Sequence, residues 1–160
     1  MSVSYIQRTR TLYDSLGYPP YSWFHADSPP TWAPLKKSLA ECRLGMLATA
    51  GTYVAGQVAY YYKDDTSFRK IPKETPTENL RFSHITENYL FDAWQEPNTA
   101  FPIDALRRLE NEGVIGELAS NLFSCMGGIY SQRRVKEELI PVLDKELQAE
   151  KIDALLLVPL

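Results

Sequence analysis

Two residues of the sequence could carry out proton-transfer or thiol chemistry, because each lies near the end of a predicted strand. His84 ends an alternating segment at residues 80–85, and imidazole exchanges a proton near neutral pH. Cys125 precedes the pair Gly127 and Gly128, where a following helix N-terminus would lower the pKa of a thiol. We therefore consider both as catalytic candidates. The alternative for each is structural, since lone histidines are usually hydrogen-bonded and free cysteines are usually buried.

A second group of residues could bind a small molecule beside these two candidates. Gly51 follows the apolar run 43–50, where a glycine either allows a ligand to approach the backbone or simply forms the turn. The amides of Gly51, Gly127 and Gly128 could hold a substrate carboxylate. The predicted substrate-binding residues are Thr49, Gly51, Thr52, Tyr53, Ser83, Ser124, Met126, Gly127, Gly128 and Tyr130.

The sequence predicts no metal and no cofactor. The thiols of Cys42 and Cys125 are far apart in sequence and neither belongs to a CxxC pair. Asp64 and Asp65 have no further acidic residues nearby, so a solvated turn is favoured over a cation site. The nucleotide-binding and hydrolase patterns GxGxxG, GxxxxGK[ST] and GxSxG do not occur.

The composition is that of an ordinary globular domain. The chain has 160 residues, 44% of them hydrophobic, and its 17 basic and 20 acidic residues give a net charge of −3 without a long block of either sign. A nucleic-acid partner is therefore not expected. No apolar window is long enough for a membrane span and the N-terminus has no export signal, so we expect a cytoplasmic protein that contacts no membrane.

The hydrophobic spacing predicts alternating strands and helices that would position these candidates. Short apolar or alternating runs predict strands at 43–50, 80–85, 117–126 and 152–159, whereas residues 5–16, 102–113 and 131–150 have helical spacing. Pro141 falls inside the last helix and is expected to kink it. The long segment 52–77 is predicted to be an ordered loop.

This order of elements predicts an α/β fold with a mostly parallel sheet, in the Rossmann-like or flavodoxin-like manner. Residues 1–160 would form a single domain, in which residues 1–40 contribute a short helix and an irregular arm rich in proline and aromatic residues, and residues 41–160 contribute the sheet core. That arm would pack on its own domain or dock on a partner subunit. The candidate residues follow three neighbouring predicted strands, so they would line one pocket.

Several segments of the sequence resemble the selenoprotein B family of the glycine, sarcosine, betaine and D-proline reductases. The most specific are the FPIDALRRLENEGVIGELA run and the S-x-M-G turn that follows it. The matching stretches, in the order of the family, are LGMLATAGTYVAG at 44–56, DDTSFRKIP at 64–72, LRFSHI at 80–85, FPIDALRRLENEGVIGELA at 101–119, FSCMGGIY at 123–130 and IDALLLVP at 152–159.

The resemblance implies reductive cleavage of a bond next to an amino-acid carbon by a selenol or thiol, with electrons from a thioredoxin-type system. It also implies a reactive residue after the strand at Leu155–Pro159, and the sequence given ends at Leu160 without such a residue. We therefore expect a partner chain to supply the missing half. The resemblance aligns His84 with a family histidine and gives Cys125 no catalytic role.

Two functional hypotheses from different classes follow. In the first, the chain is a reductase subunit that binds a small carboxylate-bearing substrate and forms a homo-oligomer or a hetero-complex. In the second, it is a non-catalytic binding or scaffolding protein that oligomerises through its C-terminal strand and its aromatic arm. A thiol-dependent racemase or lyase is disfavoured, because Cys42 and Cys125 would lie at opposite ends of the sheet.

Overall fold

The computed structural model describes residues 4–21, 23 and 25–160. The chain divides into two compact units, Met1–Pro34 and Leu35–Leu160, and we describe each by itself. Whether residues 1–160 act as a single domain stays a prediction.

The first unit consists of one helix and an aromatic segment. Helix α1 (Tyr5–Ser15) has the predicted position, and the chain leaves it through Gly17, whose φ is 71°. The described residues between Gly17 and Pro34 form neither helix nor strand. Within this unit Tyr13 and Tyr21 pack edge to face with their centroids 5.7 Å apart. The aromatic side chains of the unit therefore contact one another.

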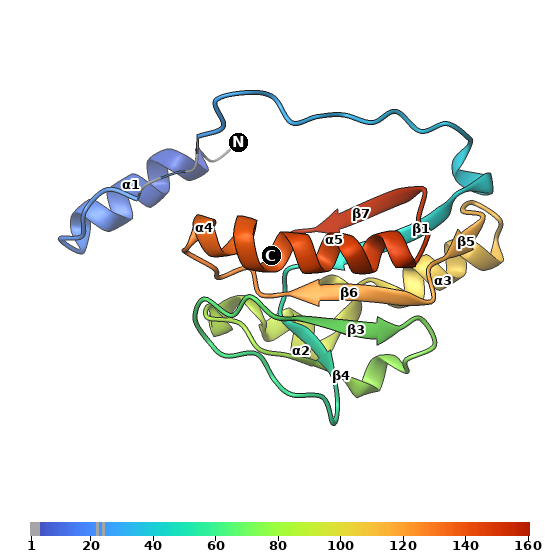
Figure 1. Cartoon of the computed structure of the whole chain (residues 1–160). Helices are drawn as coiled ribbons and strands as arrows, with labels where there is room; N and C mark the ends of the chain where they lie inside the picture. The colour runs from blue at the N-terminus through green and yellow to red at the C-terminus, as the bar shows by residue number, and fades with distance from the viewer. Residues whose placement is uncertain (1–3, 22, 24) are drawn as a thin grey trace. The chain divides into compact units, whose positions relative to one another are not determined.

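A five-stranded sheet forms the core of the second unit (Figure 1). Strand β1 (Arg43–Ala48) pairs in parallel with β7 (Ala154–Val158) along one edge. Along its other edge, β5 (Glu117–Leu118) pairs with the beginning of β1 and β6 (Asn121–Cys125) with its end, both in parallel. Strand β3 (Phe68–Pro72) is antiparallel to β6. The sheet is mixed but mostly parallel, which confirms the predicted α/β class.

The prediction that residues 80–85 form a strand of the parallel sheet is wrong. Strand β4 (Leu80–Phe82) is shorter and pairs antiparallel with β2 (Thr52–Val54) in a separate two-stranded sheet. The cause is the turn at Gly51, whose φ of 63° directs the chain out of the main sheet directly after β1. The segment 52–77, predicted as a loop, therefore contains both β2 and β3.

Three helical segments flank the sheet. Helix α3 (Ile103–Asn111) begins after Pro102 as predicted, and the short helix α2 (Phe91–Gln95) precedes it. The last helical region starts with α4 (Gln132–Arg134) and ends with α5 (Ile140–Ala149).

The π-helical segment Val135–Leu139 joins α4 to α5. Pro141 lies in the first turn of α5 and cannot donate a backbone hydrogen bond. A π turn directly before this proline gives room to the carbonyl that its ring would otherwise meet. The predicted disturbance at Pro141 thus takes the form of a π segment.

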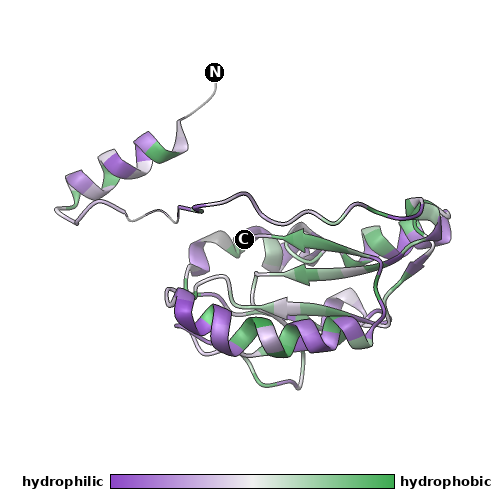
Figure 2. Cartoon of the chain, turned by 45° about the horizontal axis from the view of Figure 1, so that its top comes forward, coloured by the Kyte–Doolittle hydropathy of each residue, from purple (hydrophilic) through white to green (hydrophobic). Residues whose placement is uncertain are grey.

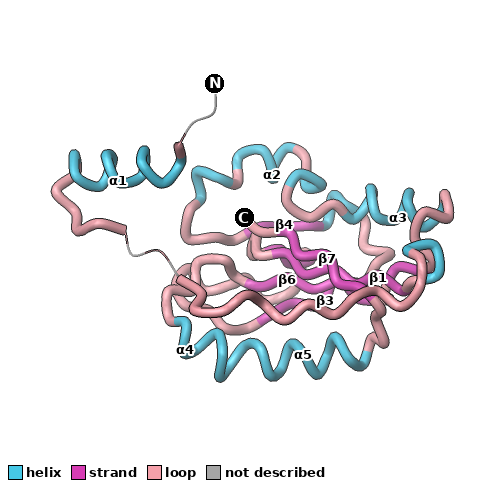
Figure 3. Tube along the Cα trace, turned by 90° about the horizontal axis from the view of Figure 1, so that it is seen from above, coloured by secondary structure: helices cyan, strands magenta, loops and turns pink. Residues whose placement is uncertain are grey.

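The helices cover both faces of the sheet (Figure 3). Leu139 and Leu143 of the last helical region pack with Phe123 and Cys125 on one face, while α3 contributes to a larger apolar cluster on the other. The strands themselves are coloured as hydrophobic in Figure 2. The central strands β1 and β6 are therefore buried on both faces, as expected for parallel strands, whereas the edge strands β7 and β3 are more exposed.

Strand β7 forms an open edge of this sheet. Within the part of the chain that the structure describes, β1 is the one strand that pairs with it. The side chains of Leu155, Leu156 and Leu157 are exposed by 36%, 37% and 62%. No helix among the described residues is both long and apolar enough to cross a membrane.

Candidate functional site

Three segments meet at the carboxyl end of the parallel strands. Gly51, which follows β1, donates its N–H to the carbonyl of Cys125 at 3.0 Å, and its own carbonyl accepts the N–H of Ser83 at 3.0 Å. Beyond β7, the N–H of Leu160 donates to Oγ1 of Thr49 at 2.9 Å. The chain around Gly51, Ser83 and Cys125 therefore lies together, although β4 lies outside the main sheet. That the predicted residues line one pocket stays a prediction.

Glycines at this edge allow the backbone of the chain itself to approach closely. A Cβ at Gly51 would overlap the carbonyl oxygen of Ser83, and a Cβ at Gly128 would overlap the side chain of Ile85. A Cβ at Gly127 would lie 2.9 Å from Nε2 of His84. Gly51 thus forms a turn against another segment of this chain, which was one of the two interpretations left open by the sequence.

His84 presents an unpaired donor in this region. Its side chain is 8% exposed, and its Nδ1 accepts the N–H of Thr86 at 3.2 Å and lies 2.7 Å from Oγ1 of Thr86. Because Nδ1 accepts, the neutral ring carries its proton on Nε2. Burial lowers the pKa of His84, so the ring is neutral at pH 7. Nε2 is buried and has no hydrogen-bond partner among the described residues.

The His84 ring lines an open cavity of about 670 Å³. The other lining residues are Tyr62, Ile85, Thr86, Glu87 and Asn88. Of these lining residues, only His84 was identified from the sequence. Nothing in the local sequence pattern indicates that Tyr62 lies next to residues 84–88.

Ser124 and Thr52 make structural contacts in the interior of the second unit. Both residues are fully buried, and the N–H of Thr52 donates to Oγ of Ser124 at 2.8 Å. The hydroxyl of Tyr60 donates to the Ser124 carbonyl at 2.7 Å, and burial raises the pKa of Tyr60. Oγ1 of Thr52 has no partner among the described residues. These groups tie β2 and the following loop to β6.

Cys125 lies on the other face of the sheet from the side chain of Ser124. It is 4% exposed and packs with Phe123, Leu139 and Leu143. Burial raises its pKa to about 11, so the thiol is protonated at neutral pH. Since the thiolate is the nucleophile, these surroundings disfavour the predicted catalytic role, which stays a prediction.

The backbone donors at this edge differ in availability. The amides of Tyr130 and Ser131 donate to Oδ1 of Asp64 at 2.7 and 3.2 Å, so a carboxylate of the chain itself occupies the start of the last helical region. The amide of Gly51 is also engaged. Ala50 and Met126 form an isolated antiparallel bridge, which also engages the backbone next to Gly127. That the amides of Gly127 and Gly128 hold a substrate carboxylate stays a prediction.

The other predicted binding residues surround this edge at different depths. Thr49 and Tyr53 are half-buried, Ser83 donates its hydroxyl to the carbonyl of Tyr60 at 3.2 Å, and Met126 is buried. Tyr130 is 62% exposed. No group of three metal-ligating His, Cys, Asp or Glu side chains occurs within the described ranges.

Comparisons with known proteins match this chain to a reductase family. Residues 79–159, just over half of the chain, match the family described as glycine/sarcosine/betaine reductase selenoprotein B. The chain is also 33% identical over 129 residues to the D-proline reductase subunit gamma of Acetoanaerobium sticklandii.

The aligned part is 81% of this chain and 53% of that relative, so the chain spans about half the length of the curated relative that it matches. No solved structure matches. The family match includes β4, α3, β6 and β7, and with them His84 and the Gly127–Gly128 pair. The chain therefore belongs to the glycine/sarcosine/betaine reductase selenoprotein B family.

Proposed function

We propose that this chain is a subunit of a cytoplasmic reductase that cleaves a small amino-acid-like substrate by thiol- or disulfide-linked chemistry. Family membership supports the reaction class, and a relative at 33% identity is named as a subunit of D-proline reductase. The observation that carries the proposal is the buried Nε2–H of His84, which has no described partner and faces the edge where Gly127 lies.

In this proposal the carboxyl edge of the sheet binds the substrate carboxylate. Nε2–H of His84 is a buried donor without an acceptor among the described residues, and the Gly127–Gly128 backbone lies beside it. Buried donors without partners are costly, and binding of an acceptor oxygen removes that cost. His84 is neutral, so it orients the carboxylate as a hydrogen-bond donor. A bound carboxylate favours the imidazolium form, and in that form His84 can also supply a proton to a leaving group.

A partner chain completes the reductase in this proposal. The chain spans about half of the relative, and the resemblance implies a reactive selenol or thiol after β7. The carboxyl end of β7 lies at the same edge as His84, since Leu160 bonds to Thr49 and its carbonyl lies beside Gly127. A reactive group delivered to this edge would meet a substrate held by His84.

The second candidate function is a non-catalytic binding or scaffolding protein that oligomerises. Two observations favour it: the thiol of Cys125 is buried with a pKa of about 11, and the β7 edge exposes Leu157 by 62%. The two functions differ in whether the His84 edge binds a substrate and whether a thiol- or selenol-bearing chain copurifies.

The test is a titration of the ¹⁵N-labelled protein with glycine, sarcosine, betaine and D-proline in turn, followed by NMR. We expect at least one of them to shift the signals of His84 Nε2 and of the Gly127 and Gly128 amides. His84→Ala should weaken that binding about tenfold or more, the loss typical of a hydrogen bond to a charged group, whereas His25→Ala should leave it unchanged.

Absence of a shift with all four compounds would overturn the proposed binding site. A native mass measurement of the complex from cells addresses the partner. A stoichiometric second chain with a reactive cysteine or selenocysteine supports the split reductase, and a homo-oligomer without it supports the scaffolding function.

A further inference from the structure

We propose that Asp64 is a positioning residue that fixes the loop 60–67 so that Tyr62 forms a wall of the His84 cavity. The proposal deepens the proposed function, because it names what holds the mouth of the same site. Hydrogen bonds fix both ends of this loop, and Tyr62 lies between them.

The first end of the loop is fixed at Tyr60. Its hydroxyl donates to the carbonyl of Ser124 in β6 at 2.7 Å, and its own carbonyl accepts the hydroxyl of Ser83 at 3.2 Å. The guanidinium of Arg69 lies 4.3 Å from the centroid of the Tyr60 ring. Tyr60 is 5% exposed, so this end of the loop is part of the core.

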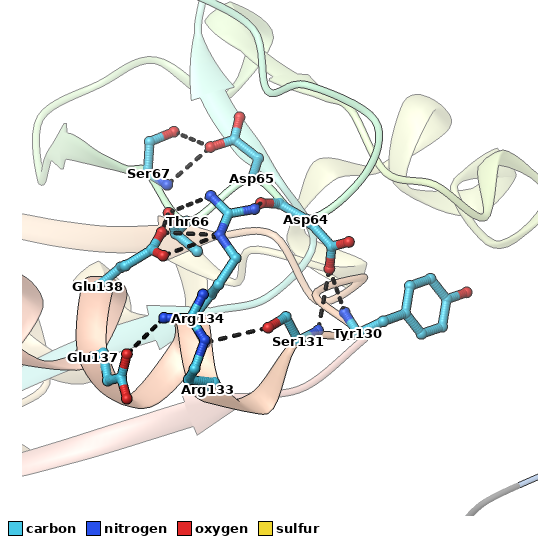
Figure 4. Close-up of polar contacts among 10 residues, drawn as sticks. All are labelled: Asp64, Asp65, Thr66, Ser67, Tyr130, Ser131, Arg133, Arg134, Glu137 and Glu138. Carbon is cyan, nitrogen blue, oxygen red and sulfur yellow. Dashed lines mark hydrogen bonds and ion pairs between the residues drawn. The ribbon is translucent and has the colours of Figure 1, made fainter.

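The second end is fixed by the carboxylate of Asp64 (Figure 4). Oδ1 of Asp64 accepts the N–H groups of Tyr130 and Ser131 at 2.7 and 3.2 Å. These amides begin the last helical region, where a carboxylate is stabilised by the unsatisfied N–H groups and the helix dipole. Asp64 has a φ of 51°, a conformation that its two hydrogen bonds must hold in place.

Arg134 of the same helical region also forms hydrogen bonds to the loop. Its guanidinium donates to the Asp64 carbonyl at 2.7 Å and to the Glu138 carboxylate at 2.9 Å. The hydroxyl of Thr66 donates to Glu138 at 3.0 Å. Figure 4 shows Arg134 between the loop and Glu138, so the loop is bonded to two successive turns of the helix.

Between the two fixed ends lie Tyr61, Tyr62 and Lys63. The rings of Tyr61 and Tyr62 have centroids 4.7 Å apart and are 64% and 58% exposed. Tyr62 lines the cavity together with His84. Oδ2 of Asp65 also accepts the N–H of Tyr61 at 2.7 Å. A three-residue span with both ends fixed has few conformations available, and in this proposal the carboxylate of Asp64 supplies the bonds at the second end that keep the Tyr62 ring at the cavity.

A purely structural role for Asp64, as a helix cap, makes a different prediction. Loss of a capping side chain destabilises a helix by about 1 kcal/mol and leaves a neighbouring cavity unchanged. Ser131 provides the matched control, because its Oγ accepts the N–H of Arg134 at the same helix start and makes no contact that holds Tyr62.

The test measures access to His84 without any substrate. Diethyl pyrocarbonate modifies neutral imidazole, and peptide mass spectrometry gives the rate for His84 relative to His25 of the same chain. We expect Asp64→Ala to raise this ratio about fivefold or more. Asp64→Asn keeps an oxygen that can accept both amides and should stay within twofold of the wild type, as should Ser131→Ala.

The link through Tyr62 is tested in the same assay. Tyr62→Ala alone should raise the ratio, and addition of Asp64→Ala to that variant should change it by less than twofold. An unchanged ratio in Asp64→Ala, an equal change in Ser131→Ala, or fully additive effects with Tyr62→Ala would overturn the proposal. Because no ligand is present, these outcomes are separate from failure of the NMR titration to detect substrate binding.

Discussion

The two ends of the parallel sheet differ in how their polar groups are paired. At the amino end, the guanidinium of Arg43 pairs with both Glu117 and Glu150, and Asp153 accepts the N–H of Arg43 at 2.8 Å. At the carboxyl end, Nε2 of His84 is buried without a described partner. The first end contains charges that satisfy one another, and the second contains a donor that does not.

Under the proposed function, the amino end of the sheet contributes to stability and the carboxyl end binds the substrate. A buried polar group without a partner costs about 1–3 kcal/mol, so such groups are rare away from functional sites. Arg43 and Glu150 connect β1 to the end of α5, which stabilises the fold. His84 makes no hydrogen bond through Nε2 among the described residues, and the proposed ligand would supply the missing acceptor.

The largest expected loss of stability is for Gly51→Ala, at the carboxyl end of the sheet. The new Cβ would overlap the Ser83 carbonyl, and φ at this position is 63°, so we expect a loss of more than about 3 kcal/mol in the free energy of unfolding. Gly113→Ala is the matched control: its φ is 69° with open space around it, and it should lose only about 1 kcal/mol. Urea unfolding of both variants measures the difference, and equal losses would contradict the steric explanation.

A smaller loss is expected at the amino end, in Glu150→Ala. The Glu150 side chain is 13% exposed and accepts from Arg43 and from the side chain of Asn121 at 2.6 Å. Its removal takes the acceptor from the amides of Asn121 and Ser120 and one of two carboxylates from Arg43, which should cost about 2–3 kcal/mol.

The reactivity of His84 toward diethyl pyrocarbonate should not change in Glu150→Ala, since the two ends of the sheet are separate. Glu117→Gln is the control at the same end. Its side chain is 56% exposed, so Glu117→Gln should change the free energy of unfolding much less than Glu150→Ala does. A change in His84 reactivity in Glu150→Ala would show that the two ends are coupled.

The two ends should also lose stability in different pH ranges. Burial lowers the pKa of His84 below its unfolded value of 6.5, so the unfolded chain binds the proton first and stability falls as pH drops below that value. At the amino end, the bond to Lys37 lowers the pKa of Asp153 below 3.8. This stabilisation is complete above the unfolded pKa and is lost only as pH falls through the folded pKa.

Unfolding free energies measured from pH 8 to pH 3 should therefore show two separate decreases. His84→Gln should remove the upper decrease and keep the lower one, and Asp153→Asn should weaken the lower one. Persistence of the upper decrease in His84→Gln would assign it to another group.

The smallest loss of stability among these predictions is expected for Thr86→Val. Loss of the hydroxyl 2.7 Å from Nδ1 of His84 should cost about 0.5–1 kcal/mol, because the backbone N–H of residue 86 still donates to Nδ1. The ¹⁵N chemical shifts of His84 should continue to show the proton on Nε2. A switch of the proton to Nδ1 would mean that the hydroxyl, not the amide, sets the tautomer.

Much of the sheet and its helices could be predicted from spacing in the sequence. The apolar runs in β1 and β7 and the helical period of α3 are local signals, and these elements lie within the predicted ranges. The predicted strand 117–126 is divided into β5 and β6, which pair with opposite ends of β1. Strand β3 was missed because its pairing with β6 is antiparallel and is determined by residues distant in sequence. Segment 80–85 was misassigned because alternation does not reveal which sheet a strand joins.

The candidate site was predictable in location and less so in detail. His84 was identified from its residue type and its place after an alternating segment, but the cavity wall at Tyr62 depends on a distant loop. For Cys125, the predicted effect of a helix N-terminus on its pKa is outweighed by burial, and Asp64 already occupies that N-terminus. Alternation in β6 places Cys125 on the same side as Phe123, and this signal could have indicated its burial.

The open edge of β7 has a directional consequence for assembly. The strand runs parallel to β1 and ends where Leu160 meets Thr49, beside Gly127. A strand from another molecule that joins this edge in parallel would bring its own carboxyl terminus toward the His84 cavity, whereas an antiparallel strand would bring its amino terminus. The polarity of docking at β7 thus selects which terminal group of a partner strand, an anion or a cation, arrives next to the donors of the site.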